Sequence, residues 1–230
     1  MVENRYGDLL VKGNQEIIVF NPANFTTRIE LALELRRIVG DKKDIKILEL
    51  GCGEGDQTKY ILEKVPGIKI DCLDISEEMI KSAKIFLSEY PDRINFIVCD
   101  ALEYLESLNF KYDVIFSAWT LHNFSWESKK KVFEKIYTSL GTNGKFLLMD
   151  KLYPDNKKEQ EILLALQLKR YNYLSEDLRE EISNHEMQDY LDDYRMEESQ
   201  SINVLKEMGF KNVKILDRLE RDVLLIAERN

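Results

Sequence analysis

The chain has few of the residues that mark flexible linkers, disulfide frameworks or membrane spans. Its 230 residues include 4 prolines and 10 glycines, which excludes a long linker and a collagen-like repeat. The three cysteines, Cys52, Cys72 and Cys99, are odd in number and form no C-x-x-C pair, so we expect reduced thiols. No apolar run is long enough to span a membrane, and the N-terminus lacks a basic-then-apolar signal pattern. We therefore expect a cytoplasmic protein with no membrane partner.

Positive charge is also in short supply. The 33 Lys and Arg residues face 42 Asp and Glu residues, which gives a net charge of −9. This balance argues against nucleic acid as a partner, because a nucleic-acid binder needs a basic face. Hydrophobic residues make up 44% of the chain and aromatic residues 10%, enough to fill the core of one domain that carries an inserted subdomain.

Short apolar runs alternate with amphipathic segments between residues 45 and 150. Each run is nearly continuous in Ile, Val, Leu or Phe, as in a strand buried on both faces of a parallel sheet. Helical spacing of apolar residues predicts the intervening helices, with Ser76 as the N-cap of the second. The alternation predicts an α/β, doubly wound, Rossmann-like and mostly parallel sheet. The expected strands are 45–50, 68–74, 94–100, 112–118 and 144–150, and the expected helices are 56–65, 77–89 and 127–140.

The alternation stops after Met149. An apolar stripe predicts a helix over 156–175, and residues 176–198 then carry ten acidic and two basic residues. We interpret this acidic segment as solvated helices over the top edge of the sheet. A helix over 199–208 and strands over 212–219 and 222–229 close the chain. The short link between these two strands predicts a hairpin, so the last of seven strands runs antiparallel to its neighbour.

The strongest local signal is the segment ILELGCGEGDQT, residues 47–58. A buried strand turns through Gly51, Gly53 and Gly55 into a helix, and such glycines let the backbone approach a ligand closely. A turn of this kind also occurs without a ligand. The dinucleotide fingerprint G-x-G-x-x-G requires a third glycine where this chain has Asp56. An acid there would repel a pyrophosphate, so an NAD-dependent dehydrogenase is disfavoured.

Three consecutive strands each carry an acid at the carboxyl edge, where open α/β sheets bind ligands. Glu49 precedes the glycine loop, and Asp74 ends the next strand about twenty residues later. Rossmann geometry places the acceptor for the ribose hydroxyls at that second position. Asp100 ends the third strand, where its carboxylate can accept a hydrogen bond from an adenine amine.

These segments resemble the class I S-adenosylmethionine-dependent methyltransferases. The segments ILELGCGEG, CLDIS, CDALE, SAWTLHNF and SLGTNGKFLLMD match five motifs of that family in order, mainly over residues 25–150, although Thr142 and Asn143 replace the usual Pro-Gly turn. The resemblance implies S-adenosyl-L-methionine as the cofactor and a methyl transfer. It implies these cofactor-binding residues: Glu49, Gly51, Cys52, Gly53, Gly55, Asp74, Ile75, Met79, Asp100, Ala101, Leu102, Ser117 and Phe25.

Within the family, the helical segment after the fifth strand resembles the carboxy-S-adenosylmethionine synthase group, which acts in tRNA modification. Members of that group hold the additional carboxylate with an arginine shortly before a final Gly-Phe. The matching stretch SQSINVLKEMGF has no arginine, and the aligned position falls near Val204. A carboxylate without a counter-charge in a partly buried site is costly, so we expect the ordinary cofactor.

Methyl transfer from a sulfonium is an in-line displacement that requires a base only when the acceptor must lose a proton. His122 follows the fourth strand and is the candidate catalytic base, although packing in its loop explains it equally well. Trp119 and Phe124 could wall the acceptor pocket. His185 lies in the acidic segment and is expected at the surface. No His-x-x-x-His or clustered acid spacing predicts a metal site.

We expect a single methyltransferase domain over 1–230. Its segments 1–30 and 151–205 would form a helical lid over the active site, which suits a small-molecule acceptor. A carboxy-S-adenosylmethionine synthase-like or tRNA-modifying enzyme stays open, as does a non-catalytic protein that only binds the cofactor. The sequence leaves the oligomeric state open, with a homodimer through the helical insertion the arrangement that base rates favour.

Overall fold

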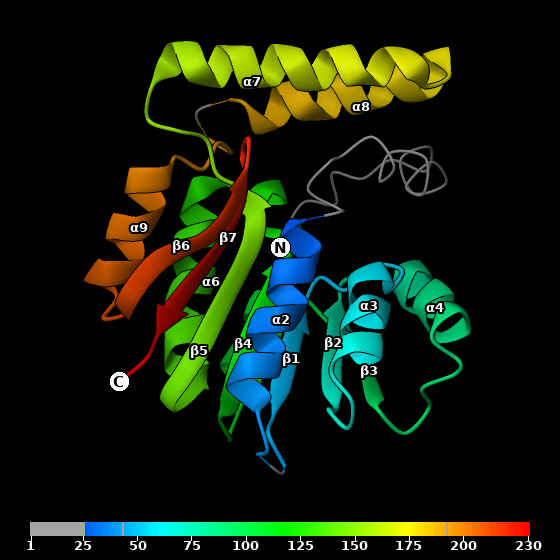
Figure 1. Ribbon diagram of the computed structural model, residues 1–230, viewed down its shortest axis with the longest axis vertical. Helices are drawn as coiled ribbons and strands as arrows, with labels where there is room; N and C mark the ends of the chain where they lie inside the picture. The colour runs from blue at the N-terminus through cyan, green and yellow to red at the C-terminus, as the bar shows by residue number, and fades with distance from the viewer. Residues whose placement is uncertain (1–25, 43, 192) are drawn as a thin grey trace.

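A computed structural model describes residues 26–42, 44–191 and 193–230. In these residues a seven-stranded sheet has the order β3-β2-β1-β4-β5-β7-β6 (Figure 1). The first five strands run parallel, and β7 lies antiparallel between β5 and β6. This confirms the predicted Rossmann-like fold and its antiparallel last strand. The strands are β1 Ile47–Leu50, β2 Ile70–Asp74, β3 Ile94–Val98, β4 Tyr112–Ala118, β5 Leu140–Lys151, β6 Lys211–Leu219 and β7 Asp222–Glu228.

Helices cover both faces of the sheet, as continuous apolar strands require. All four residues of β1 are buried. One core cluster joins one face of the sheet to α2 (Thr27–Val39), α3 (Asp56–Lys64) and α4 (Glu77–Phe86). A second cluster joins the other face to α5 (Ala101–Ser107), α6 (Trp126–Ser139) and α9 (Glu198–Glu207). The predicted cap is confirmed, because the Ser76 hydroxyl accepts a hydrogen bond from the Met79 backbone N–H at 3.2 Å.

Two further helices lie beyond the carboxyl ends of the parallel strands (Figure 1). They are α7 (Lys157–Arg170) and α8 (Glu176–Asp189), joined by the short helix η3 (Tyr171–Tyr173). Four residues, Tyr171, Leu174, Leu178 and Ile182, give this pair a small apolar core of its own. We call α7, η3 and α8 the helical cap.

The main departures from the expected elements are local. The short helix α5 was not predicted, and β5 begins at Leu140 rather than at residue 144. Asn143, where the family has Pro-Gly, adopts a left-handed φ of 62° within the turn at the start of this strand. Phe25 and most of the expected lid segment 1–30 lie outside the described residues.

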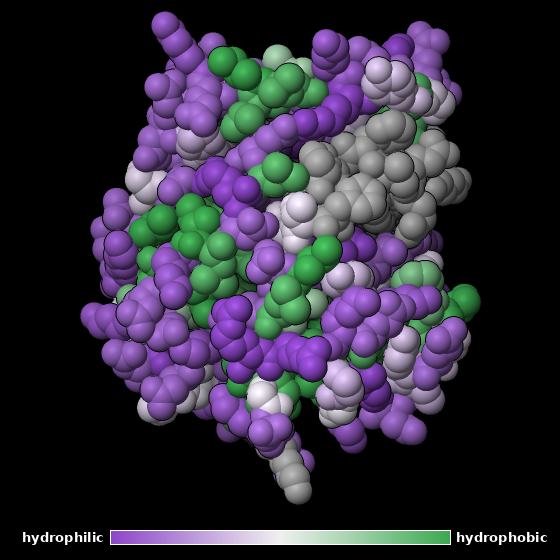
Figure 2. Space-filling view, viewed as in Figure 1, coloured by the Kyte–Doolittle hydropathy of each residue, from purple (hydrophilic) through white to green (hydrophobic). Residues whose placement is uncertain are grey.

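Among the described residues, no helix combines the length and the apolar composition needed to span a bilayer. On the face shown in Figure 2, hydrophilic side chains predominate and apolar side chains gather in separate patches.

Candidate functional site

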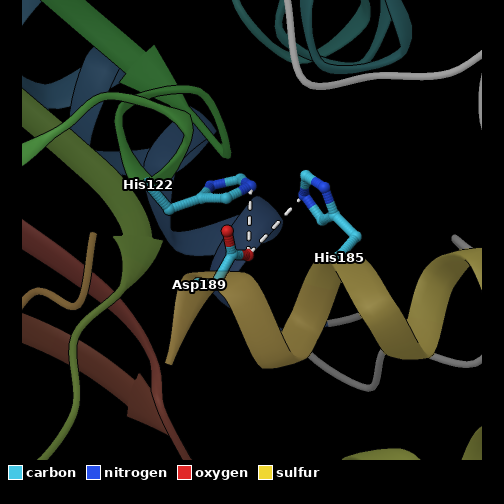
Figure 3. A group of neighbouring side chains, drawn as sticks. All are labelled: His122, His185 and Asp189. Carbon is cyan, nitrogen blue, oxygen red and sulfur yellow. Dashed lines mark ion pairs between the residues drawn. The ribbon is translucent and has the colours of Figure 1, made fainter. Parts of the chain in front are cut away.

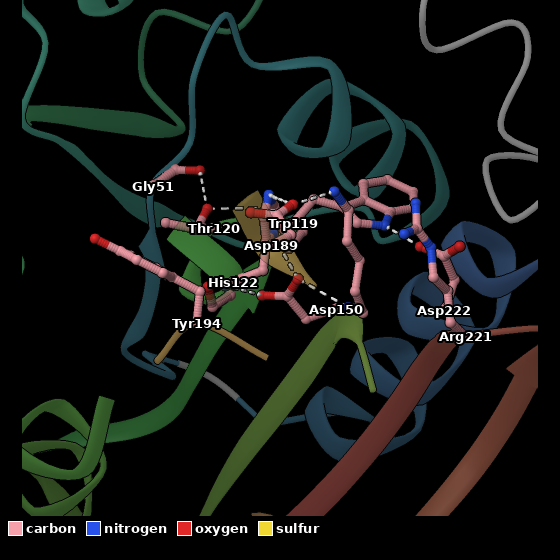
Figure 4. Close-up of polar contacts among 12 residues, drawn as sticks. Gly51, Trp119, Thr120, His122, Asp150, Asp189, Tyr194, Arg221 and Asp222 are labelled. Carbon is pink, nitrogen blue, oxygen red and sulfur yellow. Dashed lines mark hydrogen bonds and ion pairs between the residues drawn. The ribbon is translucent and has the colours of Figure 1, made fainter. Parts of the chain in front are cut away.

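The glycine loop leaves the carboxyl end of β1 and packs tightly against the loop after β4. A Cβ on Gly51 would lie 2.3 Å from Oγ1 of Thr120, and this hydroxyl donates a hydrogen bond to the Gly51 carbonyl at 3.0 Å (Figure 4). Gly53 has a left-handed φ of 53° and nothing within 4 Å of where its Cβ would lie. The loop is therefore packed against Thr120 at Gly51 and has free space beside Gly53.

Asp74 holds this loop from the end of β2. Its two carboxylate oxygens accept hydrogen bonds from the backbone N–H groups of Gly53 and Ser76, each at 2.9 Å. Burial raises the pKa of Asp74 above its ordinary value, while these N–H bonds act to lower it. Each oxygen keeps a second lone pair that can accept a ligand hydroxyl. Beside it, Ile75 is 45% exposed, and Met79 on α4 is partly buried.

Glu49 lies beneath the loop and is fully buried. Its carboxylate accepts a hydrogen bond from the Thr58 hydroxyl at 2.5 Å and contacts the Cys72 thiol at 3.8 Å. Burial raises the pKa of Glu49 to about 7. Cys52 in the loop is also buried. A hydrogen bond with Cys72 acts to lower the pKa of its thiol, but burial and the nearby carboxyls of Glu49 and Asp74 raise it more, so the net shift is upward, which disfavours a thiolate. Gly55 is the N-cap of α3.

Asp100 lies just after the carboxyl end of β3, and Ser117 lies near the carboxyl end of β4. One Asp100 oxygen caps α5 by accepting the backbone N–H groups of Leu102 and Glu103 at 2.8 and 3.2 Å, with Ala101 between the cap and Leu102. The hydroxyl of Ser117 is buried and donates to the Leu50 carbonyl at 3.2 Å. The structure thus gathers the expected cofactor residues at the carboxyl ends of β1 to β4, Phe25 excepted.

His122 lies in the short helix η2 (Leu121–Asn123) after β4. It is buried, its Nδ1 lies 2.7 Å from Asp150 Oδ1, and its backbone N–H donates to Asp150 Oδ2 at 3.1 Å. Burial acts to raise the pKa of Asp150, but His122 and the backbone N–H of Lys151 lower it more, so the net shift is downward. An ionised Asp150 can accept a hydrogen bond from Nδ1–H of His122, and this bond fixes the orientation of the imidazole ring.

The expectation that His185 lies at the surface is wrong. It is buried on the face of α8 that is turned toward His122, and its Nε2 lies 3.6 Å from Asp189 Oδ2, which is itself 3.8 Å from Nε2 of His122 (Figure 3). Burial lowers the pKa of His185 to about 3. Burial acts to raise the pKa of Asp189, but contacts led by that with Lys151 bring it down to about 2.

The acidic segment is likewise only partly solvated. Two of its acids, Glu186 and Asp189, are buried on α8, and their carboxylates lie 3.1 and 2.7 Å from the ammonium of Lys151. Arg221, at the turn between β6 and β7, pairs with Glu186 at 2.6 Å, and the Tyr171 hydroxyl donates to the same carboxylate at 2.8 Å. Buried charges need partners of opposite sign, and these two bases are far from the acids in sequence. A local charge count therefore gives no sign of them.

Trp119 and Phe124 have different surroundings. Trp119 takes a left-handed φ of 49°, and its indole N–H donates to Asp222 at 2.7 Å, with the Arg28 guanidinium 5.8 Å from its ring centre. A strained backbone at a non-glycine residue is typical of functional sites. Phe124 is buried in the core that α5, α6 and α9 share.

The chain was compared with known proteins. Residues 47–144 match a family model described as a methyltransferase domain. The chain is 42% identical over 107 residues to malonyl-[acyl-carrier protein] O-methyltransferase 1 from Ilyobacter polytropus, a match that covers 46% of this chain and 38% of that protein. It is 27% identical over 213 residues to carboxy-S-adenosyl-L-methionine synthase from Nautilia profundicola, over 91% of this chain and 86% of that protein.

Among solved structures, a carbon methyltransferase named CurJ has a TM-score of 0.68 with this chain at 18% identity. The match covers 99% of this chain and 59% of that one. The chain thus spans less than two thirds of this solved chain and of the Ilyobacter relative. At this identity, the structural likeness establishes a shared fold.

Proposed function

Because residues 47–144 belong to the methyltransferase-domain family, we propose that this chain binds S-adenosyl-L-methionine and transfers its methyl group to a small-molecule acceptor. One observation carries the proposal, namely the glycine loop with carboxylates at the ends of the two strands beside it. Gly53, Asp74 and Asp100 lie at the ends of β1, β2 and β3, which are neighbours in the sheet.

The residues at this edge fit that cofactor. The open side of Gly53 leaves room for the methionine part, and Asp74 keeps lone pairs for two ribose hydroxyls. Ile75 is exposed next to Asp74, where an apolar adenine ring would cover it. The acid at position 56 on the first turn of α3 disfavours a pyrophosphate, whereas the proposed cofactor carries no phosphate.

When bound, S-adenosyl-L-methionine supplies a methyl group that is already activated by its sulfonium. The protein then has to hold the acceptor in line with that group and exclude water. His122 is the residue proposed to act on the acceptor, since Asp150 holds its Nδ1 at 2.7 Å and fixes the orientation of its ring, with Nε2 3.8 Å from Asp189 Oδ2. The helical cap lies over the edge of the sheet where the parallel strands have their carboxyl ends (Figure 1). A covered site suits a small acceptor better than a polymer.

The test is a transfer assay with cofactor labelled on the methyl group. Cell extract is separated into small-molecule and macromolecular fractions, and each is incubated with the chain. The proposal expects label in the small-molecule fraction, loss of transfer with Asp74→Ala, and a large fall in kcat with His122→Gln while cofactor binding persists. Label found in RNA or protein alone would contradict the small-molecule acceptor.

A carboxy-S-adenosyl-L-methionine synthase-like activity is the second candidate. It is favoured by the relative of that name, which aligns over 91% of this chain. Against it, the aligned position of that group's arginine falls near Val204 on α9, an apolar residue packed against the core, and the stretch around it has no arginine. Mass spectrometry of the small molecule released from the purified protein separates the two, since the second candidate requires a cofactor heavier by one carboxylate.

A further inference from the structure

The two histidines of this chain come together at one buried point beside the proposed acceptor site. The sequence has 2 histidines, 63 positions apart, yet His122 and His185 have ring centres 6.0 Å apart. Asp189 lies one helical turn after His185 on α8 and contacts both rings (Figure 3). One ligand atom from each of these three residues lies within 4.8 Å of the other two. We call His122, His185 and Asp189 the His-His-Asp cluster.

We propose that the His-His-Asp cluster binds a divalent first-row transition metal ion, with Zn²⁺ as the probe, and that this ion holds the methyl acceptor through an oxygen atom. Two imidazoles and one carboxylate are a ligand set that such ions use when further positions stay open for substrate. The set does not suit Mg²⁺ or Ca²⁺, which prefer oxygen ligands.

The distances within the cluster approach those of a metal site. Metal–ligand bonds of about 2.0–2.1 Å at tetrahedral angles place two ligand atoms ~3.4 Å apart. The two imidazole-to-carboxylate distances are 3.6 and 3.8 Å, a few tenths of an ångström above that value. The ligand atoms of the two imidazoles lie within 4.8 Å of one another, so a common ion also requires the two rings to move closer together.

The surroundings of the cluster also fit a metal. Asp150 at 2.7 Å from Nδ1 orients His122 so that Nε2 faces the cluster, which is the carboxylate–histidine support that metal-bound imidazoles usually have. Lys151 contacts Asp189 but also Glu186, so its ammonium stays paired if Asp189 turns toward an ion.

The cluster is next to the proposed cofactor site. Two residues before His122, Thr120 contacts the carbonyl of Gly51 in the glycine loop (Figure 4). An acceptor oxygen bound to the ion would lose its proton to water more readily. Its electron pair would then form the bond to the methyl carbon, and the carbon–sulfur bond would break with its electrons going to sulfur. This role for the ion rests on the proposed function, and it makes His122 a metal ligand instead of a base.

The test begins with the tag-free 230-residue chain, treated with EDTA and then titrated with ZnCl₂ by calorimetry. We expect one equivalent to bind with micromolar or tighter affinity. His185→Gln and Asp189→Asn should each weaken binding about 100-fold, and Glu180→Gln, which removes an exposed acid from the same helix, should leave it unchanged. Equal affinity in wild type and His185→Gln would overturn the proposal.

A second measurement needs no variant. With ¹⁵N-labelled histidine, the spectrum contains two imidazoles, and Zn²⁺ should shift the signals of both. Zn²⁺ that binds without shifting them, or does not bind at all, overturns the proposal whether or not the variants fold. The cofactor is titrated separately. If the protein binds S-adenosyl-L-methionine but does not bind Zn²⁺, the metal site alone is refuted. If it binds Zn²⁺ but does not bind S-adenosyl-L-methionine, the proposed function alone is refuted.

Discussion

Replacing Glu49 by glutamine should change the stability of the ligand-free protein in favour of the variant as the pH rises. The carboxylate is fully buried beneath the glycine loop, with the Thr58 hydroxyl and the Cys72 thiol as its hydrogen-bond partners. Burial raises its pKa to about 7 from an ordinary 4.5. Glutamine has nearly the same shape and keeps an oxygen acceptor for Thr58, but it never ionises.

The magnitude follows from this difference in pKa. A carboxyl whose pKa is higher in the folded state binds more protons folded than unfolded between the two values. The free energy of unfolding therefore falls as the pH rises from 4.5 to about 7 and stays lower above that. At 1.36 kcal/mol for each pKa unit, the full effect is about 3 kcal/mol. All other groups titrate in both proteins and cancel in the difference.

The assay is urea unfolding of wild type and Glu49→Gln at intervals from pH 4.5 to 8.5. The difference in the free energy of unfolding should change in favour of the variant by up to about 3 kcal/mol across this range, whatever constant offset the added amide N–H groups cause. Glu63→Gln, which removes an exposed carboxyl from α3, reports the effect of losing one charge. A difference that is independent of pH, or that changes in favour of wild type as the pH rises, would refute the reasoning.

Three further outcomes follow from the contacts around the site. Lys151→Met leaves two carboxylates of α8 buried without their ammonium, and urea unfolding should show a loss of about 3–5 kcal/mol; a loss below 1 kcal/mol would contradict a buried pair. Gly51→Ala forces a methyl group against Thr120, and calorimetry should show at least tenfold weaker cofactor binding, whereas unchanged affinity would mean that the loop has room. Asp150→Asn removes the acceptor that orients His122, so kcat should fall by at least tenfold with little change in KM for the cofactor; a fall in cofactor affinity alone would contradict an acceptor-side role.

Much of the fold and of the glycine-loop site could be predicted because local pattern determines both. Strands such as β1 and β4 are buried on both faces and show as unbroken apolar runs. Parallel strands bring their carboxyl ends to one edge, so the order of Asp74 and Asp100 in the sequence predicts their proximity. The short helix α5 was not predicted, since its seven residues show less than two full helical turns of periodicity.

The burial of His185 could not be predicted in this way. Its neighbours in sequence are mostly acidic, and a local count indicates a solvated helix. The burial depends on Lys151 and Arg221, which reach α8 from β5 and from the turn before β7. Two signals in the sequence were available. One is the spacing of His185 and Asp189, which places them on one face of a helix, and the other is that a chain with 2 histidines has one in each of two segments expected at the carboxyl edge of the sheet.

The central claim is that the carboxyl ends of β1 and β2 bind S-adenosyl-L-methionine. It is tested most directly by isothermal titration of the purified protein with S-adenosyl-L-methionine, S-adenosylhomocysteine and NADH. The measurement is repeated on Asp74→Ala and on Asp92→Ala, an exposed acid in the turn before β3. We predict micromolar binding of both adenosyl compounds to wild type and Asp92→Ala, loss of both in a folded Asp74→Ala, and no binding of NADH. Binding of NADH alone, or no binding of either adenosyl compound to protein shown by mass spectrometry to carry no ligand, would contradict the claim.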